Sequence, residues 1–457
     1  MGMKMNGLKT LAITGAALAA ISVFGCKKAE DENKIVIYTH QTMHVLGDEL
    51  KDESGNTYRD PSTAYEKILA EQFTAETGIE VEFQTIGSEG GVVMQLLQVG
   101  DKGLDMFTVG WTITNDEYVK YTQPIMTMAE ASDIYGKDFA AAMPNKNGNV
   151  YALNVAKEFG EAFTYNETVL KSIGYDGIPQ TQAEFETMLE KIKAKGIVPI
   201  ALMRVQNWPL FAAAQIATYI RGEPDGFVKM LKDPEPFTEN APVGKTIKLY
   251  ADWKARGFFE KEVYPDFGIA MDSVANGKAG MMFFGSWVVQ QVVSRVPAGS
   301  NNVIKFDAAP DFGKGRFILT NGSQTYAINK ASKKAEQCKK YLEYVATHPQ
   351  YIADIGCIAN HKDVESIAPE YFALVQQHIE EGIVQQIVAP PATDNAINND
   401  EILKDINLLA DNAWIGLAFD AIDITKATDW TAFDAQLARQ NEAYKKARSE
   451  RGVTYVE

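Results

Sequence analysis

The order in which strand-like and helix-like segments alternate restricts this chain more than any other feature of its sequence. Residues 34–38 are apolar and β-branched, as in a buried strand. From Pro61 onward the chain reads as a helix, with Tyr65, Ile68, Leu69 and Phe73 on one face and with Gly78 able to end it with a positive φ. Residues 79–83 then alternate apolar side chains with glutamates and predict a second strand. Strand, helix and strand in this order form a βαβ unit, so we expect an α/β fold.

The alternation continues along the chain. The pattern predicts a helix over 92–99 and a strand within 104–109. Thr181 can cap a further helix whose buried stripe is Phe185, Met188, Leu189 and Ile192. This helix leads to an apolar strand over 197–202, and another apolar run fills 281–284. Because 457 residues exceed the ~100–150 of a typical domain, at least two hydrophobic cores are expected. The sequence therefore predicts two parallel-sheet domains.

The charge balance argues against nucleic acid as a partner. Acidic residues outnumber basic ones by 60 to 44, and the formal net charge is −16. Binding to a phosphate backbone requires clustered Lys and Arg, and no long basic run is present in the sequence. We therefore expect no nucleic-acid partner.

The sequence offers few motifs that could bind a metal or a cofactor or carry out catalysis. His40 and His44 are four residues apart, but Gln41 stands where a zinc protease has Glu. The sequence also has no Walker loop, no G-x-G-x-x-G after the first strand and no G-x-S-x-G. We therefore predict no metal, no cofactor and no catalytic residue. A glycosidase needs only two carboxylates, so this enzyme class stays open as an alternative.

The N-terminal region has the pattern of a secretory signal. Within residues 1–25, two lysines precede an apolar stretch that is shorter than the ~20 residues of a membrane span. Residues 23–26 resemble a bacterial lipobox, in which lipid is attached to the cysteine, here Cys26. Residues 26–33 are polar and charged and predict a solvated tether. We therefore expect a lipoprotein.

Tryptophan follows three of the predicted strands. Trp111, Trp208 and Trp287 each come after one, and the carboxyl ends of strands in an open parallel sheet border the ligand crevice. Flat indoles suit the apolar faces of sugar rings, while polar neighbours suit the hydroxyl groups. Any one of these indoles could instead pack in a core. As a set they indicate a carbohydrate site, with polar neighbours at Asp116, Asn207 and Ser286.

Seven segments carry a family resemblance, at residues 34–38, 73–81, 103–107, 165–166, 185–202, 276–287 and 326–329. The most specific is 276–287, where Gly-Lys-Ala-Gly-Met is followed by Gly-Ser-Trp. Together with the lipobox, these segments resemble the extracellular solute-binding proteins of family 1, the maltose-binding-protein-like receptors of bacterial sugar ABC transporters.

The resemblance implies a two-lobed, periplasmic-binding-protein-like fold of type II, in which two parallel-sheet domains are joined by a hinge. It places the first lobe in residues 34–156 and 314–362 and the second lobe in 157–313 and 363–457. The stretch Val45–Arg59 is longer than the usual loop of the family and could reshape the crevice.

The resemblance also implies site residues. By order and spacing, Trp111 matches the sugar-contacting aromatic residue of the first lobe, and Trp208 matches an aromatic residue of the second. Trp287 matches the stacking residue of the Gly-Ser-Trp run. Trp414 matches a tryptophan near the C-terminal helices that faces the crevice.

Three more residues complete the expected ligand-binding set. The family can place a polar sugar contact in the hinge strand, at Glu158 or Phe159, and His40 ends the first strand. The function implied is that of a substrate-binding lipoprotein of an ABC transporter. We expect a monomer outside the cytoplasmic membrane that captures a neutral saccharide, closes on it and delivers it to a permease. The alternative is a surface lipoprotein glycoside hydrolase that uses a carboxylate pair.

Overall fold

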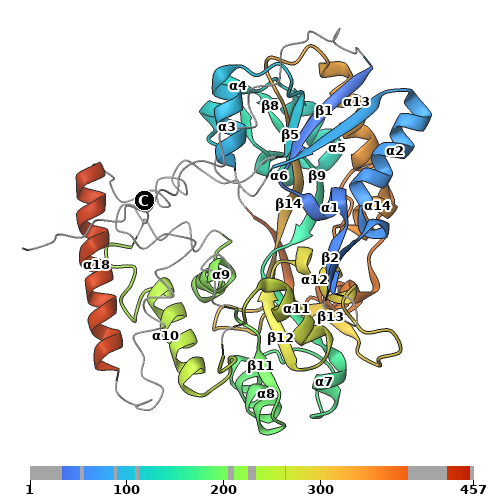
Figure 1. Cartoon of the computed structure of the whole chain (residues 1–457). Helices are drawn as coiled ribbons and strands as arrows, with labels where there is room; N and C mark the ends of the chain where they lie inside the picture. Colours follow the sequence, from blue (N-terminus) through green and yellow to red (C-terminus); the bar gives the residue numbers. More distant parts are fainter. Residues whose placement is uncertain are drawn as a thin grey trace, which may run out of the picture.

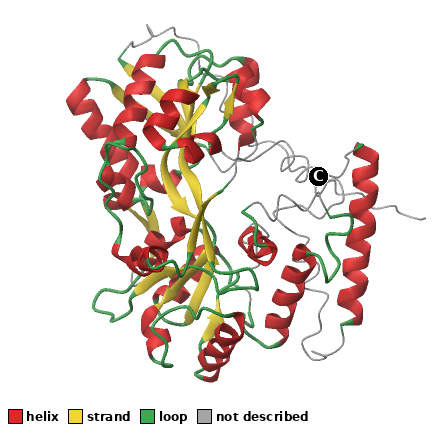
Figure 2. Ribbon diagram, turned by 180° about the vertical axis from the view of Figure 1, so that it is seen from behind, coloured by secondary structure: helices red, strands yellow, loops and turns green. Residues whose placement is uncertain are grey.

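Two lobes, drawn one above the other in Figure 1, are joined by long strands that pass between them and that are also seen from behind in Figure 2. The computed structural model describes residues 33–51, 56–86, 90–108, 113–203, 210–224, 233–262, 264–389 and 430–452. Each lobe combines its own sheet with surrounding helices. This arrangement confirms the predicted two-lobed α/β fold.

The first lobe is built on a sheet in which β1 (Lys34–Thr39) lies between β4 (Glu80–Thr85) and β5 (Met106–Thr108). Both neighbours run parallel to β1, as the βαβ pattern predicts. Beyond β5 the sheet continues with β14 (Phe317–Ile328) and β15 (Gln385–Val388). Because β14 enters from the other lobe, it runs antiparallel to β5, and the sheet is mixed where a parallel sheet was predicted.

Helix α2 (Tyr65–Thr77) covers this sheet and begins and ends close to where the sequence predicts. Phe73 is buried in the first-lobe core, and Gly78 ends the helix with φ 74°. The buried stripe differs at one position from the prediction. Ile68 is 37% exposed, whereas the carboxyl-bearing Glu66 is fully buried.

The other helices of this lobe follow the chain order: α1 (Thr42–Leu46), α3 (Gly90–Val99), α4 (Asn115–Tyr121), α5 (Met128–Tyr135), α6 (Lys137–Ala142), α13 (Ala335–Ala346) and α14 (Pro349–Asp354). A small sheet is formed by β6 (Met126–Thr127), β7 (Asn145–Lys146) and β8 (Asn149–Val150). Within the described part of the chain, no helix has the length and apolar character that a membrane span requires.

A hairpin occupies most of the long stretch after the first strand. Its strands β2 (Asp48–Lys51) and β3 (Thr57–Asp60) pair antiparallel and lead into the short helix η1 (Pro61–Thr63). In Figure 1, β2 lies at the junction of the lobes, near α12 (Val289–Val293) of the lower lobe. The β2–β3 hairpin is therefore placed beside the space between the lobes.

The second lobe has a sheet of four strands with β12 (Ala279–Phe284) and β10 (Ala162–Asn166) at its centre. All six residues of β12 are buried, as its unbroken apolar run predicts. β11 (Val198–Ile200) runs parallel to β12, whereas β10 runs antiparallel to both β12 and β13 (Ile304–Asp307). The prediction of a parallel sheet is therefore wrong for this lobe, because β10 follows directly from the strand that crosses between the lobes.

Helix α8 (Gln182–Ala194) shows how closely local sequence sets the second-lobe helices. The hydroxyl of Thr181 accepts a hydrogen bond from the backbone N–H of Glu184, as the capping pattern predicts. The predicted stripe is fully buried and consists of Phe185, Met188, Leu189 and Ile192. Besides α12, the other helices in the described part of this lobe are α7 (Glu167–Lys171), α9 (Leu210–Arg221), α10 (Pro242–Ala255), α11 (Phe267–Ala275), η3 (Ser286–Val288), η4 (Glu370–Phe372), α15 (Ala373–Glu380) and α18 (Thr431–Arg451).

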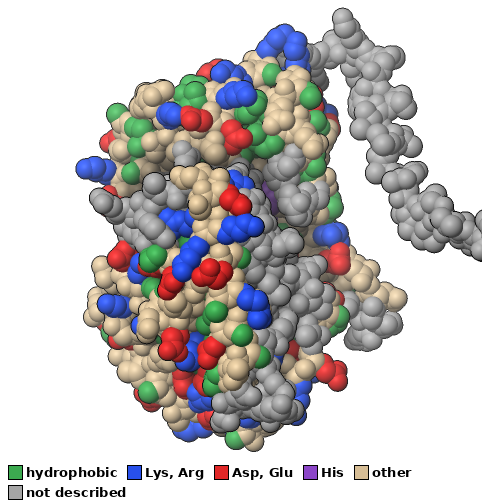
Figure 3. Space-filling view, turned by 90° about the vertical axis from the view of Figure 1, so that its left-hand side faces the viewer, with side chains coloured by type: hydrophobic (Ala, Val, Ile, Leu, Met, Phe, Trp, Pro, Cys, Tyr) green, Lys and Arg blue, Asp and Glu red, His purple; other side chains and the backbone are tan. Residues whose placement is uncertain are grey.

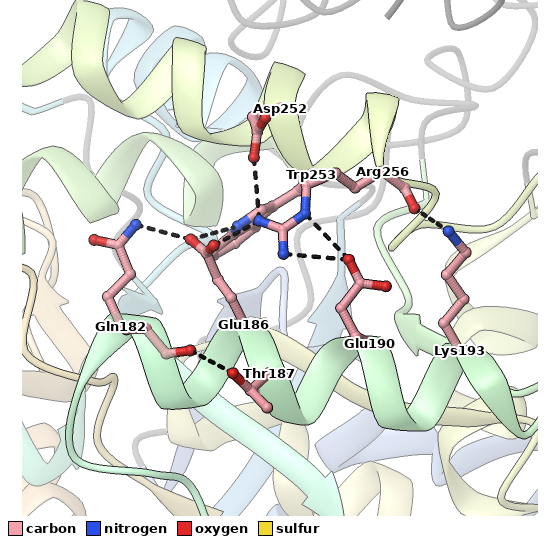
Figure 4. A network of polar contacts seen from close by, with 9 residues as sticks. Gln182, Glu186, Thr187, Glu190, Lys193, Asp252, Trp253 and Arg256 are labelled. Carbon is pink, nitrogen blue, oxygen red and sulfur yellow. Dashed lines mark hydrogen bonds and ion pairs between the residues drawn. The ribbon is translucent and has the colours of Figure 1, made fainter.

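A polar network fastens α8 to α10 on the second lobe (Figure 4). The guanidinium of Arg256 donates to Glu186 Oε2 at 2.5 Å and to Glu190 Oε1 at 3.2 Å. Trp253 is fully buried beneath this network and donates its Nε1–H to Glu186 Oε1 at 3.3 Å. Trp253 is therefore a core residue of this lobe.

The junction between the lobes is made of antiparallel backbone. β9 (Ala152–Phe159) pairs with β14 along its length, so both strands pass from one lobe to the other. A third crossing is fastened by two backbone hydrogen bonds between Lys157 and Ile358. We propose the lobe boundaries at 156/157 within β9, at 313/314 just before β14, and at 362/363 just after the pair formed by Ile358.

Candidate functional site

A pocket between the two lobes is lined by residues of both. The first lobe contributes α1, the β2–β3 hairpin, η1, the start of α2 and the end of α14, and the second lobe contributes η3 and α12. The pocket is small, with about 20 Å³ of space open to a water-sized sphere. Its lining residues are Met43, His44, Asp48, Thr63, Tyr65, Trp287, Gln290, Gln291, Asp354 and Ile355.

A second hollow lies against the second-lobe core, with Tyr175, Glu184, Arg316 and His378 among its lining residues. Arg316 there forms a buried ion pair with Asp307 at 3.0 Å. Of these two pockets, the first joins the carboxyl end of the second-lobe strand β12 to the first lobe. Ligands of open α/β sheets bind outside such strand ends, so we place the candidate site in the pocket between the lobes.

Trp287 provides an aromatic surface of this pocket. It lies in η3, directly after β12, and its partly exposed indole packs against Phe267 and Phe284 with ring centroids 6.0 and 6.2 Å away. A Cβ atom added to Gly285 would lie 2.8 Å from Cδ1 of the indole, so glycine is needed for this close approach. The structure places the indole at the carboxyl end of the strand, as predicted. Its contact with a sugar stays a prediction.

Ser286 and Phe159 lie in the second-lobe core and are not among the residues that line the pocket. By its position before an apolar run at helical spacing, Ser286 is expected to cap a helix, but its hydroxyl instead accepts a hydrogen bond from the backbone N–H of Phe159 at 3.0 Å. The ring of Phe159 packs between Phe306 and Phe372, with centroids 6.1 and 5.4 Å away. These two residues therefore support the pocket wall from behind.

Glu158 lies beside Phe159 in the crossing strand β9. Ser323 Oγ on β14 donates a hydrogen bond to Glu158 Oε2 at 2.8 Å. Burial raises the pKa of Glu158 to about 8, and it raises the pKa of the nearby Glu161 to about 7. Of the two hinge candidates we retain Glu158, since a largely protonated carboxyl group can both donate and accept hydrogen bonds.

His40 lies where the parallel strands β1 and β5 end side by side. Its Nδ1 is 2.9 Å from Thr108 Oγ1, and its backbone N–H donates to the same oxygen at 3.2 Å. Burial lowers the pKa of His40, so the imidazole is held neutral at neutral pH. The side chain is thus fixed at the carboxyl end of the first-lobe sheet, and it is not among the residues that line the pocket.

His44 lines the pocket and is held by a residue far away in the sequence. Gln324 Nε2 lies 3.4 Å from His44 Nδ1 and donates to it, which leaves the proton of the neutral ring on Nε2. Burial, with a smaller effect from His40, lowers the pKa of His44 to about 4. Gln324 itself has φ 51°, a left-handed backbone in the middle of β14. The hinge strand therefore orients a hydrogen-bond donor of the pocket.

Asp116 is placed at the surface. It stands in the first turn of α4, its side chain is 74% exposed, and it forms an ion pair with Lys146. It is not among the residues that line the pocket. Trp111, Asn207, Trp208 and Trp414, together with Cys26, lie outside the described residues and stay predictions.

Several pocket residues were missed by the sequence argument. Gln290 and Gln291 follow Trp287 by three and four positions, which is the spacing of one helix face, so this signal could have found them. For Tyr65, Asp48 and Asp354, which only the tertiary fold brings to the pocket, we find no local signal.

The electrostatics of the described surface are mixed. On the face shown in Figure 3, basic and acidic side chains are interspersed over the described part of both lobes. Within the described ranges no group of three or more His, Cys, Asp or Glu side chains is placed to hold a metal ion. The pocket therefore offers an indole, neutral imidazole and amide groups, and the two carboxyl groups of Asp48 and Asp354.

Two α/β lobes, crossing strands and a pocket shared by both lobes define a two-lobed solute-binding protein. Residues 55–352 match the family described as bacterial extracellular solute-binding protein. This match covers more than half of the 457 residues, and the chain belongs to that family.

Two curated relatives are similar to part of the chain. The multiple sugar-binding protein of Streptococcus mutans is 25% identical over 229 residues, which cover 46% of this chain and 52% of that protein. An uncharacterized ABC transporter extracellular-binding protein of Pyrococcus horikoshii is 23% identical over 61% of this chain and 64% of its own. The chain thus spans between half and two thirds of these relatives.

Solved structures match over nearly the whole chain. The BlMnBP1 binding protein of an ABC transporter from Bifidobacterium animalis subsp. lactis, in complex with mannobiose, has a TM-score of 0.69 and 20% identity, covering 91% of this chain and 95% of that chain. RafE in complex with raffinose has a TM-score of 0.65 and 15% identity, covering 91% and 99%. At these identities the likeness shows the fold, which is that of type II solute-binding proteins.

Proposed function

We propose that this protein is the substrate-binding component of an ABC transporter, which captures a carbohydrate between its lobes and delivers it to a membrane permease. The observation that carries the proposal is the partly exposed Trp287 in a pocket shared by both lobes. The family and the printed names of its relatives, a multiple sugar-binding protein among them, support the same function.

The chemistry of the pocket suits a neutral saccharide. The indole offers a flat apolar surface for the C–H face of a sugar ring. Around it, His44 offers an N–H donor, Gln290 offers an amide, and Asp48 offers a carboxyl group to the hydroxyl edge. Trp111, Trp208 and Trp414 are proposed to extend this surface, with Glu158 and His40 as polar contacts.

The proposed mechanism is closure without a chemical reaction. A ligand that touches both lobes stabilises the closed state by the difference between its affinities for the closed and open states. The permease then recognises the closed form. We propose no catalytic residue, no cofactor and a monomeric state. The comparisons support solute binding and give no support to the glycoside hydrolase alternative.

The proposed cellular place is outside the cytoplasmic membrane, with Cys26 as the lipid anchor, because residues 23–26 resemble a lipobox. Cys26→Ser is expected to move the protein from the membrane fraction of cells to the soluble fraction. Retention of the variant in the membrane to the native extent would contradict lipid anchoring without affecting the proposed ligand.

The proposed ligand is tested by thermal unfolding of the native protein with mannobiose, mannotriose, raffinose, chitin oligosaccharides and galactose. A saccharide at about 100 times its Kd should raise the free energy of unfolding by about 2.7 kcal/mol. Incubation followed by product analysis should recover the bound saccharide intact. The appearance of shorter products would favour a hydrolase, and stabilisation only by amino acids or peptides would contradict carbohydrate binding.

A further inference from the structure

The β2–β3 hairpin is anchored tightly to the first lobe. Gly47 has φ 86°, and an added Cβ there would lie 1.8 Å from the carbonyl oxygen of Asp60, so the two ends of the hairpin meet closely. The backbone N–H of Asp48 donates to Thr63 Oγ1 at 2.7 Å, and Arg59 Nη1 donates to the carbonyl oxygen of Gly47 at 2.9 Å. The hairpin base is therefore held in one position.

The same hairpin reaches the second lobe. Ser294, at the end of α12, donates its hydroxyl to Asp48 Oδ2 at 3.0 Å. Arg295 Nη2 donates to the carbonyl oxygen of Glu49 at 3.1 Å, while its Nη1 is held by the carbonyl oxygen of Gln291 at 2.8 Å. The hairpin thus spans the space between the lobes on the side of α12.

This bridge lies at the candidate site. Asp48 lines the same pocket as Trp287, and it is 8% exposed. The space in the pocket that is open to a water-sized sphere is about 20 Å³, far below the ~300–1,000 Å³ of complete ligand sites. The hairpin and α12 therefore nearly close the crevice on this side of the indole, and a ligand that lies against Trp287 has no room to extend toward the hairpin.

We propose that the β2–β3 hairpin is the end wall of the saccharide site, so that the protein selects ligands whose terminal ring lies against Trp287 and excludes saccharides that extend past it. The inference rests on the proposed function and adds a specificity determinant to it. Asp48 is the wall residue, and its contact with Ser294 holds the wall in place.

The experiment uses the full chain and pairs of saccharides that differ at one end. One member of each pair is extended at the reducing end, for example as a 4-nitrophenyl glycoside, and the other carries an extra ring at the non-reducing end. Calorimetry on the native protein is expected to show that one end tolerates extension, whereas extension at the other end weakens the affinity at least about tenfold, or 1.4 kcal/mol.

Two variants test the wall itself. Replacing Asp48–Asp60 by two glycines removes the hairpin, and the short approach between Gly47 and Asp60 makes this connection feasible. Asp48→Ala keeps the hairpin and removes only the carboxyl group in the pocket. Both variants should reduce the difference in affinity between the two saccharides of a pair, and the deletion should reduce it more. Glu49→Ala is the matched control, because its carboxyl group is 58% exposed and pairs with Arg59.

The outcomes separate this inference from the proposed function. Native protein that binds no saccharide of the panel would overturn both. If the protein binds saccharides but extension at either end changes the affinity equally, the end-wall proposal is wrong and the proposed function stands. If the deletion variant fails to fold, Asp48→Ala decides: unchanged discrimination, equal to that of Glu49→Ala, would also overturn the end wall.

Discussion

At the scale of single residues, substitution of Trp287 should affect ligand binding more than the stability of the fold. Its indole is supported by Phe267 and Phe284 on one side and lines the pocket with the rest of its surface. Trp287→Ala should therefore weaken saccharide binding by about 1–3 kcal/mol, or roughly ten- to a hundredfold. The loss of stability should stay below the ~3–5 kcal/mol of a fully buried tryptophan. Titration calorimetry and urea unfolding of the same variant measure both quantities.

Trp253 is the control for this prediction, since its ring is fully buried between helices of the second lobe. Trp253→Phe should lower stability without a specific loss of affinity in the fraction that remains folded. If Trp287→Ala keeps full affinity but loses as much stability as a core variant, Trp287 supports the fold and does not bind the saccharide.

Glu66 is a residue whose protonation couples stability to pH. It is fully buried, Tyr326 donates its hydroxyl to Oε1, and burial raises the pKa from 4.5 to about 7. The folded protein thus keeps a proton that the unfolded chain releases. The stabilisation by Glu66 is complete below about pH 4.5, and it is lost as pH rises to about 7, a change of about 3 kcal/mol.

Glu66→Gln is expected to reduce this fall, because an amide does not ionise in this range. Glu158 and Glu161 change stability in the same direction, so the test is the difference between native and variant free energies of unfolding at pH 4.5, 6 and 8. Parallel pH profiles for the two proteins would show that Glu66 does not retain its proton in the folded state.

At the scale of elements, the turn from β12 into η3 fixes the pocket indole. Gly285 has φ −62°, which alanine adopts without strain, but an added Cβ would lie 2.8 Å from Cδ1 and 2.9 Å from Nε1 of Trp287. Gly285→Ala should therefore displace the indole and weaken saccharide binding, with a small effect on stability.

A double-mutant cycle checks this displacement. When Trp287 is already alanine, Gly285→Ala should cost little further affinity, because the clash has no partner. Calorimetry on the two single variants and the double variant measures the coupling. If the losses of binding free energy in the two single variants add up in the double variant, the substitution at Gly285 does not weaken binding by displacing the indole.

The elements that local sequence predicts are those with short-range causes. The stripe and cap of α8 and the buried β12 follow from spacing and turn residues, and they were predicted correctly. The buried Glu66 was not predicted, because its burial depends on Tyr326 from a strand 260 residues away. The contact of His44 with Gln324 spans 280 positions and likewise has no local signal. Asp48 was missed for the same reason, since only the assembled hairpin brings it to the pocket.

At the scale of the whole molecule, we expect the lobes to rotate about the crossing strands while the backbone ladder stays intact. β9 and β14 are held along their length, and the pair between Lys157 and Ile358 adds a third crossing, so bending concentrates in this narrow junction. A saccharide that binds both lobes should therefore reduce the radius of gyration without unfolding either lobe.

Small-angle scattering with and without the saccharide that stabilises the protein most should show this compaction. The size of the effect depends on differential affinity: moving the open and closed populations from 1:99 to 99:1 requires about 10⁴-fold tighter binding to the closed state. Trp287→Ala, measured at the same saccharide concentration, should compact less because its site is less occupied. Identical scattering of the free and saturated native protein would contradict closure and leave the crevice as a rigid binding site.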